Sequence, residues 1–343
     1  MRSASVDLPW SMCAMMQKLR IRAGSVNVSS AKFVDLAAIV ATSYFASPRA
    51  TVCTMPYHRL GLTDRTRPAA WWRALIELLV LVGLVIAFVA ISAMLLGLAA
   101  GLSGRNYLDL LAGTTDPLTP LVQVLLIAAI LPAPFLAALI AGRRPRALHS
   151  TALRLRWGVL GRSLAVVGAV YAVSLLIDVL RGAAADTTFN PFRLTLIAAL
   201  LIAVPLQSAA EEYVFRGALP QILGQWRAPA WLAYALPGVL FVASHTYNWI
   251  GLIDIAVFAV CTAVLTWRTG GLEAGIALHA VGNTVFFCSG AVDMLDPNAT
   301  EIGWQQMLGA ALMTIVCTIL LLWALKGVSA DQQKPLVPAG ETA

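Results

Sequence analysis

Long apolar stretches alternate with short polar connections along most of this chain. A run of about 18 or more apolar residues can cross the roughly 30 Å hydrocarbon layer of a bilayer as a helix. Eight candidate spans lie near residues 75–99, 119–141, 158–180, 194–214, 230–247, 251–267, 272–290 and 305–325. The pattern predicts an all-α fold: a polytopic membrane helix bundle of about eight transmembrane helices.

Composition supports a membrane protein and argues against several soluble classes. Of the 343 residues, 59% are hydrophobic and 12% are charged, whereas soluble domains carry about a quarter charged residues. The formal net charge is +7, but the basic residues flank the apolar stretches and form no single stripe, so no nucleic acid partner is expected. Five scattered cysteines indicate neither a disulfide framework nor a paired-cysteine metal motif.

Basic residues are concentrated in particular connections. Four precede the first span and six crowd the connection after the second: Arg59, Arg65, Arg67 and Arg73, then Arg143, Arg144, Arg146, Arg154, Arg156 and Arg162. The loop after the seventh span is acidic, with Asp293, Asp296 and Glu301. By the positive-inside rule both termini are cytoplasmic (N-in/C-in). The abundance of alanine, leucine and arginine is typical of a GC-rich bacterial genome, so we expect the bacterial cytoplasmic membrane.

We expect five segments along the chain. Residues 1–54 are only moderately apolar and show no clear signal peptide, which predicts a weakly ordered extension and allows a mis-assigned start. Met55 begins a more coherent passage that leads to an interfacial pair, Trp71 and Trp72. The other expected segments are N-terminal transmembrane helices (55–190), a catalytic core (191–290), a C-terminal transmembrane helix (291–326) and a disordered tail (327–343).

Two adjacent carboxylates lie inside the fourth apolar stretch, where a charge costs roughly 3 kcal/mol. On a helix Glu212 and Arg216 are four residues apart and can form an ion pair. Glu211 points about 100° away and is free for chemistry. The alternative is that both glutamates only satisfy Arg216 in a buried structural network. Glu77 is expected at the inner boundary of the first helix.

Two further polar groups lie in later spans. Phe241 and His245 are one helical turn apart in the fifth, and His279 and Asn283 share one face of the seventh. Each alone would more often be a packing histidine or an interhelical hydrogen bond. Unpaired polar groups are costly in lipid, so we expect them to converge on a water-containing site with the glutamates. Matching the depths of the two histidines predicts a kink or break near Pro237.

Three motifs carry a family resemblance. EEYVFRG, FVASH and HAVGN match, in order, the Glu-Glu-x-x-x-Arg, Phe-x-x-x-His and His-x-x-x-Asn motifs of the CPBP family of intramembrane proteases. This family is related to the type II CAAX prenyl endopeptidases and is also called Abi. Any one motif is weak, whereas three in order on apolar helices are specific. The resemblance covers about residues 194–290.

The resemblance implies hydrolysis of a peptide bond in a membrane-associated peptide or protein. Glu211 would be the general base on a water, assisted by His245. His279 and Asn283 would stabilise the oxyanion. Glu212 would complete the catalytic set by positioning its neighbour, and the orienting residues would be Arg216 and Phe241.

Several alternatives stay open at this point. A zinc ion held by Glu211, His245 and His279 with water as fourth ligand is possible chemistry, although an HExxH motif is absent, so the expected cofactor is none or zinc. A non-proteolytic scaffold that binds other membrane proteins would keep the same bundle. A transporter would also place charges in the membrane, but the sequence shows no inverted repeat. The expected partners are a membrane-associated substrate and the lipid bilayer.

Overall fold

The computed structural model describes residues 55–328, apart from 64, 113–115 and 186. The expectations for residues 1–54 and for the tail from residue 329 lie outside the described residues. Within the described part the chain is helical, and the only β-type pairings there are two isolated bridges, Arg65 with Arg143 and Ser150 with Gly271. The predicted all-α class is confirmed.

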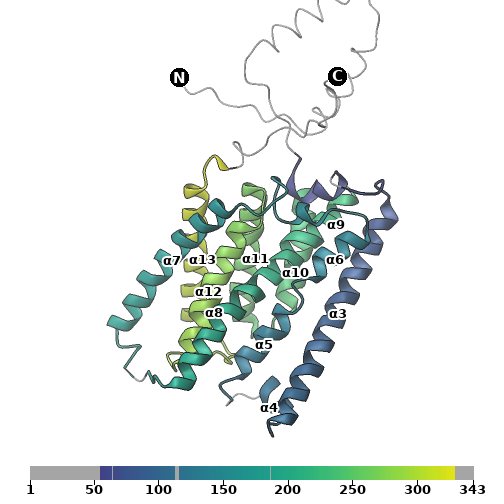
Figure 1. Ribbon diagram of the computed structural model, residues 1–343. Coiled ribbons are helices and arrows are strands. Elements are labelled where there is room, and N and C mark those ends of the chain that lie inside the picture. The colour runs from purple at the N-terminus through teal and green to yellow at the C-terminus, as the bar shows by residue number, and fades with distance from the viewer. Residues whose placement is uncertain (1–54, 64, 113–115, 186, 329–343) are drawn as a thin grey trace, which may run out of the picture. The chain divides into compact units, whose positions relative to one another are not determined.

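Fourteen helical elements follow one another along the described chain. They are η1 (Tyr57–Leu62), α3 (Trp71–Leu102), α4 (Tyr107–Ala112), α5 (Thr119–Ala128), α6 (Ala133–Ile140), η2 (Pro145–Leu148), α7 (Trp157–Leu180), α8 (Pro191–Glu212), η3 (Tyr213–Ala218), α9 (Leu219–Gln225), α10 (Ala230–Ala243), α11 (Trp249–Thr269), α12 (Glu273–Ala291) and α13 (Trp304–Ala324). The long helices run side by side as a bundle (Figure 1).

Seven helical segments of the described chain are long and apolar enough to cross a membrane. Two are composite: α5 with α6, and α8 with η3 and α9. The predicted fifth span is the exception, because α10 has 14 residues and extends only about 21 Å at 1.5 Å per residue. The start of α3 and the end of α13 nevertheless lie at the same end of the bundle (Figure 1). This arrangement fits the predicted eight passes if α10 is a short one. The number of passes and the end that faces the cytoplasm stay predictions.

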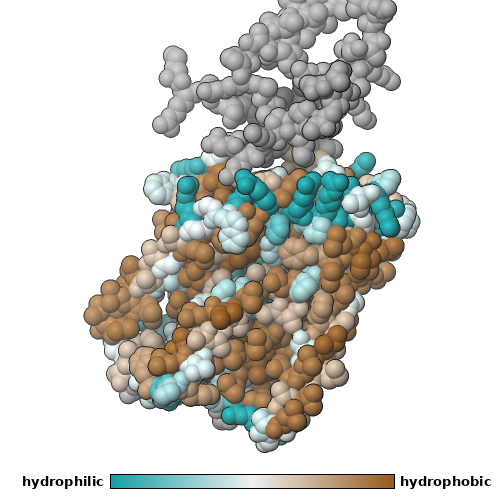
Figure 2. Space-filling model, viewed as in Figure 1, coloured by the Kyte–Doolittle hydropathy of each residue, from teal (hydrophilic) through white to brown (hydrophobic). Residues whose placement is uncertain are grey.

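The bundle surface is divided into a polar end and an apolar body. In Figure 2, hydrophilic residues gather at the end that carries η1 and η2, and hydrophobic residues cover most of the visible remainder. In α3 only 6% of the apolar window is buried inside the bundle, although the helix is apolar almost throughout. Such a helix is stable only if lipid covers it. The chain is therefore a multi-pass membrane protein.

Helix α12 occupies the interior of the bundle. It packs against α7, α8 and α11, and half of its apolar window is buried, the largest share among the seven spans. Every residue from Glu273 to Ala280 is buried. The helix with the lowest mean hydropathy of the seven is thus kept away from lipid, which explains how its polar residues are tolerated.

A buried ion pair joins separate segments of the chain at the polar end of the bundle. Nη1 of Arg143 lies 3.3 Å from Oε1 of Glu77, and both side chains are fully buried. Arg143 also donates to Gln221 at 2.7 Å, and Gln225 donates to Glu77 at 2.9 Å. These contacts connect α3, the segment after α6, and α9. The sequence predicted that Glu77 lies at the inner boundary of a helix. It did not predict that the Glu77 side chain turns into the bundle and pairs with an arginine.

The short helix η1 packs directly against α9. A Cβ atom at Gly224 would collide with the backbone carbonyl of His58. This contact has no room for any side chain, so η1 depends on glycine at this position. The segment that begins at Met55 is accordingly integrated into the bundle.

We expect Gly224→Ala to destabilise the protein, because backbone must move to admit the methyl group, and overpacking of this kind costs about 1–3 kcal/mol. Gly83→Ala is the matched control, since a Cβ there meets nothing within 4 Å. Thermal unfolding in detergent should show a lower Tm for Gly224→Ala and an unchanged or slightly higher Tm for the control. Equal Tm values would contradict the tight contact.

Candidate active site

The two adjacent glutamates lie where one helix type changes into another. Glu211 and Glu212 are the last residues of α8, and the chain continues without a break into the π-helix η3, which contains Arg216. π-Helical turns are rare and occur frequently at functional sites. The wider turn sets where Arg216 points relative to the carboxylates.

Glu212 is the centre of a buried polar cluster. Its side chain is fully buried, and its Oε1 lies 3.3 Å from Nη1 of Arg216 and 3.0 Å from Nδ1 of His279. The Arg216 guanidinium stacks over Phe241, 4.1 Å from the ring centroid, a favourable cation–π arrangement. The Arg216 guanidinium thus places a positive charge beside the Glu212 carboxyl group.

The ring of His279 lies between the two glutamates. An ionised carboxylate only accepts hydrogen bonds, so the 3.0 Å contact with Glu212 is suited to a hydrogen on Nδ1 of His279. Its other ring nitrogen, Nε2, lies 3.4 Å from Oε2 of Glu211. One histidine ring thus faces both carboxyl groups.

Glu211 differs from its neighbour in accessibility. Its side chain is 11% exposed whereas that of Glu212 is fully buried. Oε2 of each glutamate is buried without a hydrogen-bond partner within the described chain. The predicted ion pair between Glu212 and Arg216 is present, and Glu211 lies next to His279. The catalytic role of Glu211 stays a prediction.

His245 lies elsewhere than the sequence predicted. Helix α10 ends at Ala243 and continues through Pro237, so His245 follows the helix instead of lying within it. A break at Pro237 is therefore absent, and a kink there stays a prediction. The Nδ1 of His245 is 2.7 Å from the carbonyl oxygen of Phe241.

Phe241 connects the two histidines through ring contacts. Its centroid is 4.7 Å from that of His245 and 6.2 Å from that of His279. Phe258 of α11 adds a T-shaped contact with His279 at 4.7 Å. The predicted orienting residue thus contacts Arg216 and both histidines. His245 joins the site through Phe241, and its described hydrogen bond is to backbone.

Asn283 pairs with a residue that the sequence reading missed. Its Nδ2 lies 3.3 Å from Oε1 of Gln207, which is four residues before Glu211 on α8. The sequence did contain a signal for Gln207. It is a polar residue one helical turn before Glu211 in an otherwise apolar span, so it lies on the same helix face as Glu211. Between α8 and α12 there are thus two polar contacts one turn apart, Glu211 with His279 and Gln207 with Asn283.

The zinc alternative gains no support from this arrangement. Within the described chain no three His, Cys, Asp or Glu side chains are grouped so that they could hold a metal ion. The Nδ1 and Nε2 atoms of His279 face Glu212 and Glu211, and Nδ1 of His245 faces a carbonyl oxygen. Glu211, His245 and His279 therefore do not form a ligand set here.

Comparison with known proteins identifies this region. Residues 193–285 match the family described as Type II CAAX prenyl endopeptidase Rce1-like. This segment of the chain is similar to that family, and we refer to residues 193–285 as the Rce1-like segment. The match confirms the resemblance found in the three motifs, and it supports a function of the CAAX intramembrane protease kind.

A curated relative matches over a similar fraction of the chain. The Uncharacterized protein YyaK of Bacillus subtilis (strain 168) is 38% identical over 109 residues, which cover 29% of this chain and 36% of YyaK. The aligned part thus spans about a third of that relative. No solved structure matches the chain.

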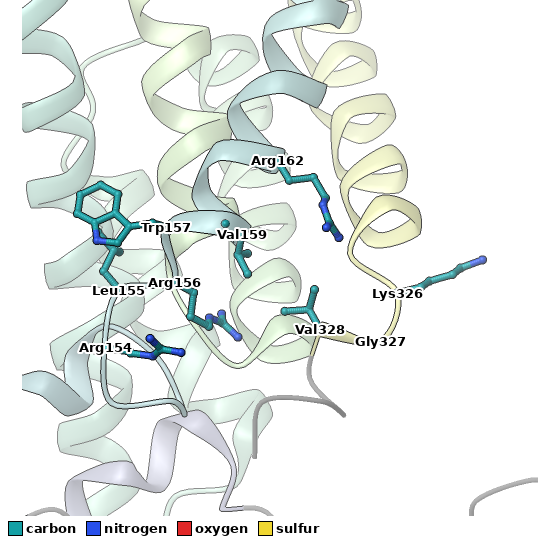
Figure 3. A pocket seen from close by; sticks show the side chains of 10 residues that line it. Arg154, Leu155, Arg156, Trp157, Val159, Arg162, Lys326, Gly327 and Val328 are labelled. Atoms are coloured by element: carbon teal, nitrogen blue, oxygen red, sulfur yellow. The ribbon is translucent and has the colours of Figure 1, made fainter. Parts of the chain in front are cut away.

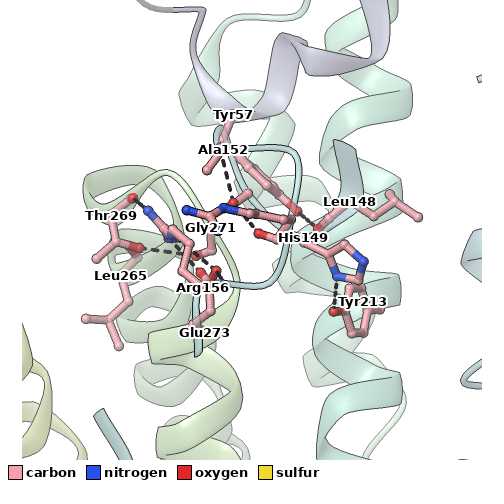
Figure 4. A network of polar contacts seen from close by, with 12 residues as sticks. Tyr57, Leu148, His149, Ala152, Arg156, Tyr213, Leu265, Thr269, Gly271 and Glu273 are labelled. Atoms are coloured by element: carbon pink, nitrogen blue, oxygen red, sulfur yellow. Dashed lines mark hydrogen bonds and ion pairs between the residues drawn. The ribbon is translucent and has the colours of Figure 1, made fainter. Parts of the chain in front are cut away.

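The Rce1-like segment is anchored at its polar end by a second buried ion pair (Figure 4). Arg156 donates to both carboxylate oxygens of Glu273, at 2.9 Å from Nε and 2.6 Å from Nη2. Its Nη1 donates to the carbonyl oxygen of Thr269 at 2.9 Å. Glu273 is the first residue of α12, so the pair fixes the start of the helix that carries His279.

A histidine contact secures the other half of the Rce1-like segment. Nδ1 of His149 is 2.5 Å from the hydroxyl of Tyr213, the first residue of η3 (Figure 4). Burial lowers the pKa of His149 below its ordinary value, which favours the neutral ring. The sequence reading identified neither this contact nor the Arg156–Glu273 pair, because their partners are distant in sequence.

We expect Glu273→Ala to lower the Tm strongly, because it leaves the buried Arg156 without its carboxylate, and breaking one side of such a pair costs about 3–5 kcal/mol. Asp109→Ala removes an exposed acidic residue and is the control. Unfolding of both variants is followed by circular dichroism in detergent. A Glu273→Ala Tm equal to that of the control would show that the pair does not hold α12.

Proposed function

We propose that this protein is an intramembrane endopeptidase of the bacterial cytoplasmic membrane that hydrolyses a peptide bond in a membrane-associated peptide or protein. The observation that carries the proposal is the buried chain of contacts from Arg216 through Glu212 and His279 to Glu211. It lies within the Rce1-like residues 193–285. Two carboxylates and a histidine are suited to moving protons in a site of low polarity.

Glu211 is the general base in this proposal. Its carboxylate takes a proton from a water as the water oxygen attacks the scissile carbonyl carbon, giving a tetrahedral oxyanion. The same carboxyl group then returns the proton to the departing amine as the carbon–nitrogen bond breaks, leaving a carboxylic acid and an amine. Its partial exposure gives it the access that Glu212 lacks.

His279 and Asn283 are the oxyanion donors. They lie one turn apart on α12, and Nε2 of His279 and Nδ2 of Asn283 both face α8. Donors fixed in a low-dielectric site stabilise a developing oxyanion more than they would in water. Glu212 holds the His279 ring through Nδ1, so donation to the oxyanion uses Nε2 and requires a proton on that atom. Arg216 places a positive charge beside Glu212.

His245 assists from the other side of Phe241 in this proposal. Its hydrogen bond to the Phe241 carbonyl uses Nδ1, so Nε2 remains for the attacking water or the leaving group. No step passes through a metal, because the described residues do not form a ligand set.

We expect Glu211→Gln to lower kcat by roughly 10²–10⁴-fold, the usual contribution of a general base, with little change in Tm because the amide is isosteric. Cleavage is measured with purified full-length protein in detergent against a quenched peptide library that includes lipidated members. Asp296→Asn, at an exposed loop position, is the matched control and should keep wild-type activity. Wild-type cleavage by Glu211→Gln would overturn the assignment.

The same assay separates the alternatives. Activity that survives a chelator supports the metal-free reaction, whereas loss with recovery on adding zinc would restore the metal reading. No cleavage by folded wild-type protein across peptide and lipidated members would favour the scaffold. In that case binding of membrane proteins should be unchanged in Glu211→Gln.

We expect Asn283→Ala to reduce kcat by about 10²–10³-fold with a small change in KM, since an oxyanion donor acts mainly in the transition state. Gln207→Leu removes the partner of Asn283 without removing the donor, so its loss of kcat should be smaller. Steady-state kinetics on one cleavable peptide measure both. An Asn283→Ala effect confined to KM would indicate a substrate-binding role instead.

A further inference from the structure

A cavity of about 420 Å³ opens at the polar end of the bundle, away from the proposed active site. It lies between the start of α7 and the end of α13 (Figure 3). Its lining combines basic and apolar side chains: Arg154, Arg156, Arg162 and Lys326 with Leu155, Trp157, Val159 and Val328. No Asp or Glu is among the residues that line it.

The positive charge of this cavity is largely uncompensated. Arg156 is already engaged by Glu273 and Thr269 through Nε and both Nη atoms, so it has little capacity for a ligand. Arg154 and Arg162 are exposed and form no ion pair with any described carboxylate. In Figure 3 Arg162 points into the space between the two helices, whereas Lys326 points outward. Among the arginines that line the cavity, Arg154 and Arg162 thus have the most capacity left for an anion.

Exposed aromatic residues place the cavity at the membrane boundary. Trp157 begins α7 and is 73% exposed, and Trp323, next to the end of α13, is 67% exposed. Tryptophan at helix ends favours the headgroup level of a bilayer. The cavity lies between these helix ends, so basic groups and apolar surface meet at the depth of lipid phosphates.

From this geometry we infer that the cavity binds the phosphate headgroup of an anionic membrane lipid. Arg154 and Arg162 hold the phosphate, since guanidinium groups match its oxygens in bidentate geometry. Leu155, Val159 and Val328 give the acyl chains an apolar edge that continues onto the bundle surface. Basic pockets between transmembrane helices commonly bind such headgroups.

Two features favour a lipid over free phosphate in solution. The apolar lining would contribute nothing to a free inorganic anion, whereas it contacts the chains of a lipid. The start of α7 also has no acidic residue in its first turn and no capping side chain, so nothing on that helix end repels a phosphate. The site shares no residue with the proposed catalytic set, and it stands whether or not the protein cleaves peptides.

The test is native mass spectrometry of the full-length protein in detergent, titrated with phosphatidylglycerol or phosphatidylcholine. We expect retained phosphatidylglycerol, weak retention of phosphatidylcholine, and a roughly tenfold or greater loss of phosphatidylglycerol affinity in Arg154→Gln/Arg162→Gln, given the contribution of each basic residue near a membrane surface. The control is Arg181→Gln at the opposite end of α7, which should bind like wild type. Both arginines of the double variant are exposed, so its Tm should match the control.

Each outcome decides the matter. Equal retention of the two lipids, or equal phosphatidylglycerol binding by wild type and the double variant, would overturn the proposal. A separate arm adds inorganic phosphate at millimolar concentration. Protection of the wild-type protein against unfolding by phosphate, without lipid retention, would identify a free-anion site and also overturn the lipid assignment.

Discussion

A single buried carboxylate, that of Glu212, organises the polar interior of this membrane bundle. It lies where η3 begins and where α12 passes, and it binds Arg216 and His279 at once. An unpaired charge at this depth would be strongly unfavourable, so the three groups must be placed together for any of them to be tolerated. Gly275 makes room for this arrangement, because a Cβ there would lie 3.1 Å from Oε2 of Glu212. The orientation of His279 and the separate environment of Glu211 both follow from that contact.

The helices that supply these groups are held by further ion pairs at the polar end of the bundle. Arg156 fixes the start of α12 through Glu273, and Arg143 joins α3 to α9 through Glu77 and Gln221. All four charged partners are buried, so each pair is costly to break but adds little net stability over an apolar replacement. Their effect is geometric. They set the height and rotation of α8, α9 and α12 relative to one another, and a proton-transfer site depends on that alignment.

Proton chemistry inside a membrane also requires limited access to water. Glu211 is mostly buried yet retains some exposure, while the rings of Phe241 and Phe258 enclose His279 on its other side. The exposed part of Glu211 and the aromatic contacts of His279 thus lie on different residues of the proposed site. The basic cavity between α7 and α13 is lined in part by Arg156, so a lipid bound there would lie next to the segment that anchors α12 through Glu273.

The sequence by itself determined the membrane class, the helical fold, the positions of most spans and the motif residues from Glu211 to Asn283, because hydrophobic runs and short-range spacing are local properties. The Rce1-like match confirms the family resemblance over residues 193–285. Tertiary structure alone decided that His245 lies beyond a helix ending at Ala243, that Gln207 pairs with Asn283, and that Glu77 and Glu273 turn inward toward arginines. Those outcomes depend on which helix faces meet. Partners 66 to 117 residues apart in sequence leave no periodic signal along the chain, so only packing could reveal them.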